Sequence, residues 1–299
     1  MTRAAAVACL ALATVLVFRA AAGSAGAEPS PIRGGSFEPS GVVHVRGTGG
    51  VLFVDDGRNR EILWMELNDD GTQRSAVIPV KLDADVTDLE GITSDGRYVY
   101  VVGSQSKRDG VDGDGLVRFR YDPATRTTTD VERIRGVRAW LAREVAELKG
   151  ADRRGKQGLN IEALAWDPRA NRLLLGLRTP IVDGDGLVVA LTPRDRSGPF
   201  TTGNFQAAPN AIRLSLGGAG IRSLEYDDHA GAFRLIADDG GNGNEEFRIA
   251  EWDGRAATIT EHISSYARSL QPEGITRATL GGRPVSVVVF DTSRFLVTD

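Results

Sequence analysis

Cysteine is almost missing from this sequence, since Cys9 is the only one among 299 residues. The rest of the chain therefore offers no disulfide, no thiol nucleophile and no thiolate ligand for a metal. Histidine is scarce too, and the three residues His44, His229 and His262 have no zinc-binding spacing. No HExxH, GxSxG or P-loop motif occurs. We therefore expect no nucleotide, flavin or haem cofactor.

An excess of basic residues is also lacking, because 36 Lys and Arg against 40 Asp and Glu give a formal net charge of −4. This mild acidity argues against binding to nucleic acid or to an anionic lipid surface.

Long apolar runs are missing after the first segment of the chain. Arg3, the apolar run of residues 4–18 and the small residues Ala25-Gly26-Ala27 are typical of a cleaved secretory signal. We expect a signal peptide over residues 1–27 and a single domain over residues 28–299. The mature protein is then exported to the periplasm or the extracellular space, soluble and monomeric, without membrane contact.

The chain contains an internal repeat, first visible as the heptapeptide VDGDGLV at Val111–Val117 and again at Val182–Val188. The segments upstream of the two copies align with each other. Each has a polar residue, an apolar residue, Glu and a small residue, followed by a strand, a turn and a second strand: DLEGITSDGRYVYVVGSQ and NIEALAWDPRANRLLLGLR. The same template fits the segments that begin EPSGVV, GIRSLEY and QPEGIT. A glycine-rich loop and further strands follow each unit, and this number of strands per repeat is typical of the four-stranded blades of a β-propeller.

The repeat predicts an all-β fold, a β-propeller with about five four-stranded blades. A sixth, degenerate blade is possible within Gly198–Gly218, and the apolar spacing of residues 137–149 predicts one inserted helix. The last unit is short, so residues before Ser40 are expected to supply its outer strand and close the ring. A two-sheet sandwich is the alternative, although it does not require matched repeats.

One position of the repeat forms a polar column: Ser40, Glu90, Glu162, Arg222 and Glu273. The first strand of a propeller blade lines the central channel, so these side chains should converge at one mouth. Carboxylates held together raise each other's pKa or bind cations, and oxygen-rich sites suit Ca²⁺ or Mg²⁺. The candidate metal ligands are Glu90, Glu162, Glu273 and Asp88.

The column leaves three interpretations open: a divalent-ion site, a site for an anionic ligand, and a structural salt-bridge network around Arg222. The candidate ligand contacts are Arg222, Arg178, Ser104 and Asp239. A metal-dependent phosphoester or ester hydrolase would use the three glutamates of the column as metal ligands or general base. The alternative is a non-catalytic propeller that binds a small molecule or an unidentified protein, or serves as a scaffold.

The heptapeptide itself is not an EF-hand loop, which requires a glutamate at position twelve. That position holds Pro123 after Asp112 and Arg194 after Asp183. Both copies are better interpreted as Asp/Gly hairpin turns that lead into the third strands of blades two and three.

The motifs DLEGI, GSQS, NIEALAWDP, LLLGLRTP, IRSLEYD and QPEGI together resemble the bacterial family known as domain of unknown function 3616, related in style to phytase-like propellers. The resemblance covers nearly all of residues 28–299 and implies a β-propeller without an established activity. The family's second-strand motif is often GSHS, whereas this chain has Gln105 at the histidine position. An acid–base role for that histidine would therefore be lost here.

Overall fold

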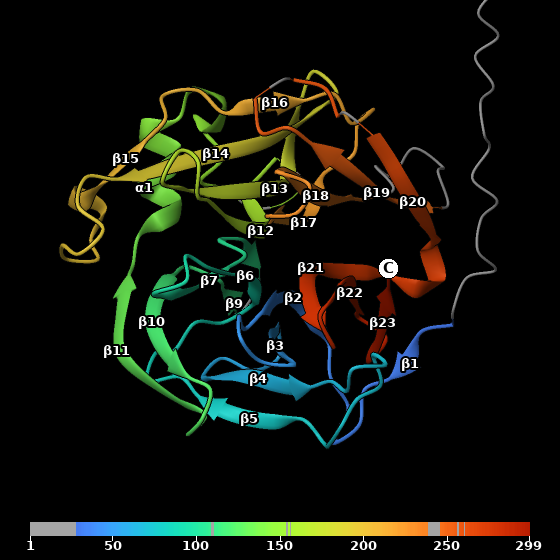
Figure 1. Ribbon diagram of the computed structural model, residues 1–299. Coiled ribbons are helices and arrows are strands. Elements are labelled where there is room, and N and C mark those ends of the chain that lie inside the picture. The colour runs from blue at the N-terminus through green and yellow to red at the C-terminus, as the bar shows by residue number, and fades with distance from the viewer. Residues whose placement is uncertain are drawn as a thin grey trace, which may run out of the picture.

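The computed structural model describes residues 28–108, 111–153, 155, 157–238, 246–255, 257–259 and 261–299. Its strands form five antiparallel sheets arranged as a ring around one axis (Figure 1). The predicted five-blade propeller is confirmed, and the two-sheet sandwich is excluded. The predicted signal segment and the candidate ligand residue Asp239 lie outside the described residues.

The first two blades follow one another along the chain. Blade one consists of β2 (Pro39–His44), β3 (Gly50–Asp55), β4 (Glu61–Glu66) and β5 (Ile78–Lys81). Blade two consists of β6 (Leu89–Ser94), β7 (Val99–Gly103), β10 (Leu116–Asp122) and β11 (Thr127–Ile134). A ribbon of β8 (Lys107–Arg108) and β9 (Val111–Asp112) is inserted between β7 and β10.

Blade three has an enlarged outer part. It consists of β12 (Asn160–Asp167), β13 (Arg172–Val182), β14 (Asp185–Pro193), β15 (Phe205–Ala207) and β16 (Ile212–Leu214). Both β15 and β16 pair with β14, and the 3-10 helix η2 (Thr202–Asn204) precedes β15. The segment Gly198–Gly218 therefore completes blade three and does not form a sixth blade.

The fourth and fifth blades end the chain. Blade four consists of β17 (Ile221–Asp227), β18 (Ala232–Ala237), β19 (Glu246–Trp252) and β20 (Glu261–Ala267). After the 3-10 helix η3 (Arg268–Leu270), blade five contains β21 (Pro272–Leu280), β22 (Arg283–Phe290), β23 (Arg294–Thr298) and β1 (Ser30–Pro31).

The two ends of the described chain close the ring, as the short last repeat predicted. Strand β1 lies antiparallel to β23, with Ser30 opposite Phe295 and Pro31 opposite Arg294 (Figure 1). The Arg294 guanidinium also donates a hydrogen bond of 2.7 Å to the carbonyl of Pro29. Pairing β23 in this way removes an exposed sheet edge.

The predicted inserted helix is present as α1 (Val137–Glu144), followed by the 3-10 helix η1 (Ala146–Leu148). Its buried residues Val137, Trp140 and Leu141 pack into a hydrophobic cluster with side chains of blades two and three. The helix thus covers the core between these two sheets. In the described part of the chain, no helix has the length and hydropathy that a membrane span requires.

The inner strands of the ring approach one another closely because small residues follow the polar column. A Cβ atom on Gly91 would lie 2.7 Å from the Cβ of Leu164 in the next blade. A Cβ on Gly41 would lie 2.6 Å from the carbonyl oxygen of Glu90. Such distances are incompatible with the packing seen, so glycine is required at these positions for the ring to close.

The two VDGDGLV copies have different structures. In the second copy, Asp183 and Gly184 have positive φ angles of 52° and 85°, and they join β13 to β14 in a two-residue hairpin. In the first copy, Val111 and Asp112 belong to β9, which pairs with β8, so the heptapeptide begins within a strand and does not form a two-residue hairpin. The hairpin interpretation is therefore confirmed for the second copy and wrong for the first.

Candidate functional site

A β-bulge lies at the polar column in all five blades. The strand register shifts between Pro39 and Val42, Leu89 and Gly91, Ile161 and Ala163, Ile221 and Ser223, and Pro272 and Gly274. A bulge leaves its extra residue outside the ladder and re-aims the side chain. The column residues are these extra residues, which accounts for their turning toward the axis of the ring.

The column residues meet in one cavity of about 910 Å³ at one mouth of the ring. Its walls include Ser40, Glu90, Glu162, Arg222 and Glu273. Arg178, predicted to approach from the second strand of blade three, lines the same cavity. The geometric part of the prediction, convergence of these side chains, is thus seen in the structure.

Arg222 is the centre of a buried ion-pair network. Its Nε atom lies 3.4 Å from Oε2 of Glu162, and its Nη1 atom donates a hydrogen bond to Oε1 of Glu273. The side chains of Arg222, Glu162 and Glu273 are only 12%, 4% and 9% exposed. Because the three residues belong to blades four, three and five, the network ties three neighbouring sheets together.

A single guanidinium cannot fully compensate two buried carboxylates. Burial raises the pKa of Glu273 to about 8, and the charge of Glu162 acts in the same direction, although Arg222 lowers it. The pKa of Arg222 is raised above its ordinary value, because the attraction of Glu162 and Glu273 exceeds the cost of its burial. Arg222 therefore stays ionised, while Glu273 retains its proton much of the time at neutral pH.

Arg178 extends the network toward solvent. Its Nη1 atom donates a hydrogen bond of 2.9 Å to Oε1 of Glu162, and its Nε atom lies 3.6 Å from Asp238. The same Glu162 oxygen accepts a hydrogen bond of 3.0 Å from the Asn160 amide. The Arg178 side chain is 40% exposed, so it is the more accessible of the two arginines.

Glu90 differs from the other column glutamates because no hydrogen bond or ion pair to its carboxyl group is found among the described residues. Burial raises its pKa well above the ordinary value, and the charges of Glu162, Asp88, Glu273 and Asp56 raise it further. Glu90 thus faces the cavity as a carboxyl group that lacks a protein cation.

Two further carboxyl groups of the wall have raised pKa values. Burial and a hydrogen bond with Glu38 raise the pKa of Asp56 to about 7, and burial and Glu38 also raise that of Asp291. Asp56 directly follows β3 of blade one, and Asp291 directly follows β22 of blade five. These residues belong to the same neighbourhood of the ring as Glu90 and Glu273.

The charges of the cavity are consequently segregated by blade. Blades five, one and two contribute the carboxyl groups of Asp291, Glu273, Asp56 and Glu90. The opposite side of the cavity is formed by blades three and four and by the neighbouring segments that carry Arg153 and Arg268. This side contributes four arginines and two acids: Arg153, Arg178, Arg222, Arg268, Glu162 and Asp238. One side of the cavity is acidic and meets an arginine only where Arg222 pairs with Glu273, and the other side is rich in arginine.

Two predicted site residues lie behind the wall of the cavity. Ser104 is fully buried and its hydroxyl donates a hydrogen bond to Asp88, which is 6% exposed. Ser106 also bonds Asp88, at 3.2 Å, and is the member of this group that lines the cavity. Gln105, at the position of the family's histidine, donates hydrogen bonds to three backbone carbonyls, including that of Gly113 at 3.2 Å.

No preformed metal centre is visible in the described segments, since none of them supplies a group of three or more His, Cys, Asp or Glu side chains arranged around a common point. A fully protein-coordinated Ca²⁺ takes six to eight oxygen ligands, whereas Mg²⁺ is often held by one or two carboxylates and several waters. The carboxyl groups on the acidic side fit the second type of coordination better than the first.

The fold and this mouth define the class of protein, a five-blade β-propeller with a charged cavity at one end of its axis. Residues 150–290 match the sequence profile of the family described as "Protein of unknown function (DUF3616)". Over these residues, just under half of the chain, the match agrees with the resemblance carried by the sequence motifs. No curated protein sequence matches the chain.

Solved propeller structures are similar in fold at low sequence identity. The major allergen Mala s 1 of Malassezia sympodialis has a TM-score of 0.54 and 10% identity, covering 92% of this chain and 95% of that chain. The soluble aldose sugar dehydrogenase of Escherichia coli has a TM-score of 0.49 and 10% identity, covering 90% and 98%.

Hydrazine synthase of Kuenenia stuttgartiensis has a TM-score of 0.39 and 10% identity over 86% of this chain, which spans 57% of that chain's length. At this level of identity, similarity extends to the fold alone.

The sequence did not single out Arg153 and Arg268 as cavity residues. Both lie outside the four-strand template, Arg153 before blade three and Arg268 in η3. Their loops do not repeat from blade to blade, so periodicity carries no signal for them.

Proposed function

We propose that the cavity binds a small anionic ligand together with a divalent cation, Mg²⁺ or Ca²⁺. The cation lies on the acidic side against Glu90 and Asp56, and the anion lies on the side of Arg178. The observation that carries this proposal is the segregation of charge by blade. A ligand of one sign satisfies only one wall, whereas a cation–anion pair, such as a metal-bound phosphate, complements both.

Glu90 is the proposed primary contact of the cation. It is the column glutamate for which the described residues supply no hydrogen-bond or ion-pair partner, and like charges around it oppose its ionisation. A divalent cation relieves this repulsion, so binding is coupled to loss of a proton from the acidic side. Glu162 and Glu273 are less suited to this role because both are already paired with Arg222.

Titration calorimetry with MgCl₂ and CaCl₂ at pH 8 tests the cation half of the proposal. Glu90→Gln preserves the shape of the side chain but removes its charge, and we expect at least about a tenfold loss of cation affinity, the equivalent of one charge-assisted contact. Glu144→Gln makes the same chemical change on the exposed surface of α1 and should bind like the wild type. Equal affinity of Glu90→Gln and wild type would contradict the assignment.

Inorganic phosphate is the probe for the anion half. It should bind more tightly when Mg²⁺ is present, and Arg178→Gln should weaken phosphate binding while leaving Mg²⁺ affinity nearly unchanged. Hydrolysis of 4-nitrophenyl phosphate, abolished by a chelator, would extend the proposal to a metal-dependent phosphoesterase. Phosphate binding without such hydrolysis would restrict it to a binding protein.

A second candidate function, a non-catalytic scaffold, is favoured by the Arg222 network. In this second candidate, the buried ion pairs across three blades have a purely structural role, which is to fix the sheets relative to one another. This candidate predicts that neither cation nor phosphate binds and that removal of Arg222 affects stability alone.

A further inference from the structure

A second cavity, of about 530 Å³, lies at the opposite end of the ring, where the five inner strands end. Its walls include His44 at the end of β2, Trp166 on β12 and Glu225 on β17. No described residue lines both cavities. The second cavity is therefore a separate candidate site, which the polar column does not reach.

A repeated hydrogen bond joins neighbouring inner strands at this end, and Glu225 departs from the pattern. The hydroxyl of Thr93 accepts a bond of 3.1 Å from the backbone N–H of Trp166 in the next blade. Thr276, at the equivalent position of blade five, forms the same bond with blade one. In blade four Glu225 takes this position, and its Oε2 atom accepts a bond of 3.1 Å from the backbone N–H of Arg277.

A threonine is sufficient for this connection between blades, so the longer carboxyl group of Glu225 provides an additional polar function facing the cavity. Burial raises the pKa of Glu225 to about 8, although hydrogen bonds from the Thr276 hydroxyl and the Arg277 backbone lower it. At neutral pH the group therefore keeps its proton, and a neutral carboxyl group is a hydrogen-bond donor.

His44 supplies a hydrogen-bond acceptor, which complements the donor on Glu225. Its Nε2 atom lies 3.0 Å from the carbonyl oxygen of Thr48. A carbonyl oxygen only accepts hydrogen bonds, so Nε2 carries the hydrogen and Nδ1 is left with a lone pair. Burial lowers the pKa of His44, and the charge of Arg46 lowers it further. His44 is consequently a neutral imidazole with an acceptor nitrogen.

The donor and the acceptor are neighbours in space. The hydroxyl of Thr276 bonds the Glu225 carboxyl group and also accepts the backbone N–H of His44, at 3.0 Å. These three residues come from β17, β21 and β2, which follow one another around the ring. Glu225 and His44 are thus linked through the hydroxyl of Thr276, and both residues line the cavity.

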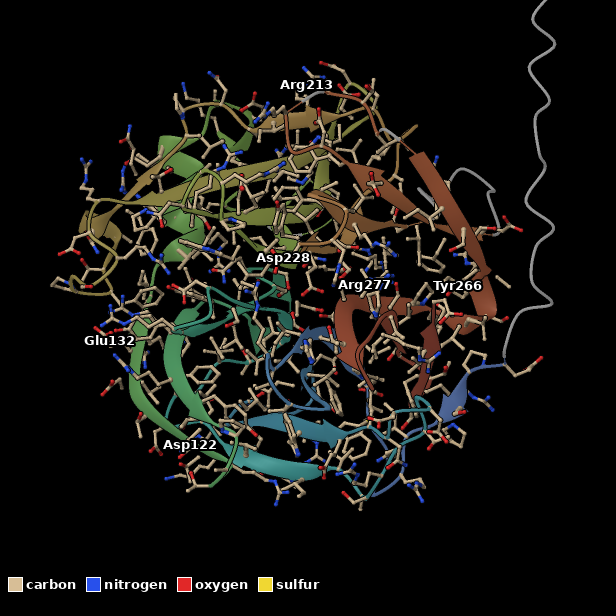
Figure 2. All side chains as sticks on the ribbon, in the orientation of Figure 1. Asp122, Glu132, Arg213, Asp228, Tyr266 and Arg277 are labelled. Atoms are coloured by element: carbon tan, nitrogen blue, oxygen red, sulfur yellow. The ribbon has the colours of Figure 1, made fainter. Side chains whose placement is uncertain are left out.

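The two arginines that line this cavity are already paired with carboxylates. Arg46 of blade one and Asp228 of blade four form an ion pair of 2.6 Å across the mouth, although both side chains are exposed. Arg277 lies 3.7 Å from Asp227 and donates a hydrogen bond to Ser286. Figure 2 labels Arg277 and Asp228, which lie near the centre of the ring. An anionic ligand would have to displace Asp228 from Arg46 or Asp227 from Arg277.

We propose that the second cavity binds a neutral polyhydroxylated compound, a sugar or a cyclitol, through one hydroxyl group that accepts a hydrogen bond from Glu225 and donates one to His44. A hydroxyl group is the small neutral group that both donates and accepts at one atom. Val43, Pro168 and Leu280 give the cavity apolar wall surface suited to the C–H face of such a compound.

The test is binding of D-glucose and myo-inositol to the intact protein and to two Glu225 variants, measured by titration calorimetry. Glu225→Gln keeps a neutral donor and an acceptor of the same shape, so the affinity should remain close to that of the wild type. Glu225→Thr restores the connection that Thr93 and Thr276 form but cannot reach a ligand, so the affinity should fall about tenfold. Circular dichroism verifies that both variants fold.

Glu144→Gln on α1 is the matched control and should bind as the wild type does. The proposal is overturned if neither compound binds to the wild type, or if Glu225→Thr binds as tightly as the wild type. A loss in Glu225→Gln equal to that in Glu225→Thr would also overturn it, because that result requires an ionised carboxylate and hence a cationic ligand.

Discussion

Replacing Arg222 by methionine removes the cation shared by two buried glutamates and leaves an unbranched apolar side chain in its place. Breaking a buried ion pair on one side costs about 3–5 kcal/mol because the remaining charge is stranded. Solvent screening does not reduce this figure much, since the Arg222 side chain is 12% exposed and that of Glu162 is 4% exposed. Two features favour the lower end of the range. Glu162 keeps its bond to Arg178, and Glu273 takes up a proton readily because its pKa is already about 8.

We therefore expect the free energy of unfolding to fall by about 3 kcal/mol at pH 7 in Arg222→Met, the lower limit for an interrupted buried pair. The loss should grow above pH 8, because without Arg222 the pKa of Glu273 rises further and holding its proton becomes more costly. Urea denaturation followed by tryptophan fluorescence measures both effects.

Arg60→Met is the control for this prediction. Arg60 forms an ion pair of 2.8 Å with Asp85, but the two side chains are 71% and 45% exposed. Exposed pairs contribute at most about 1 kcal/mol. A loss in Arg222→Met no larger than that in Arg60→Met would refute the conclusion that the network ties the blades together.

Three further predictions concern the ring itself. Gly91→Ala should destabilise the protein by about 1–3 kcal/mol in the same denaturation assay because its Cβ collides with Leu164, whereas Gly203→Ala, with no atom closer than 3.8 Å, should change little. Glu225 keeps its proton to about pH 8 when folded and loses it near its ordinary value when unfolded, so stability should fall as pH rises from 5 to 8, by at most about 1.4 kcal/mol per pH unit. Glu225→Gln should make that slope shallower without removing it, because Glu273 and Asp56 also have raised pKa values, and an unchanged slope would contradict the buried, protonated state. Deleting residues 28–31 should cost about 1–3 kcal/mol through the lost bonds between β1 and β23, and an unchanged urea midpoint would show that closure contributes nothing.

The blade count and the polar column were predictable because every blade packs against its neighbours in the same way and therefore repeats the same pattern of polar and apolar residues. The five column residues occupy equivalent positions in five units, so aligning the units was enough to bring Glu90 and Glu273 together. The closure by β1 followed from the shortness of the last unit. A repeat also tolerates insertions, which is why α1 and the enlarged outer part of blade three did not obscure it.

The bulges and the charge states were not predictable from the sequence. A bulge depends on the pairing of two strands, and a raised pKa depends on burial and on neighbours from other blades. The pairing of β8 with β9 likewise separates the two VDGDGLV copies, although their sequences are identical.

Glu225 did leave a signal that sequence analysis missed. It stands three residues after Arg222, as Thr93 does after Glu90 and Thr276 does after Glu273. The alignment therefore contained a second column, but its meaning required the hydrogen bonds between blades.

The central claim is that Glu90 and its neighbours release protons when a divalent cation enters the cavity. Titration calorimetry with MgCl₂ at pH 7, repeated in buffers of different ionisation enthalpy, counts these protons directly. The raised pKa values of Glu90 and Asp56 predict release of about one proton per cation, and Glu90→Gln should reduce both this release and the affinity. Binding without proton release, with equal affinity in Glu90→Gln, would contradict the account.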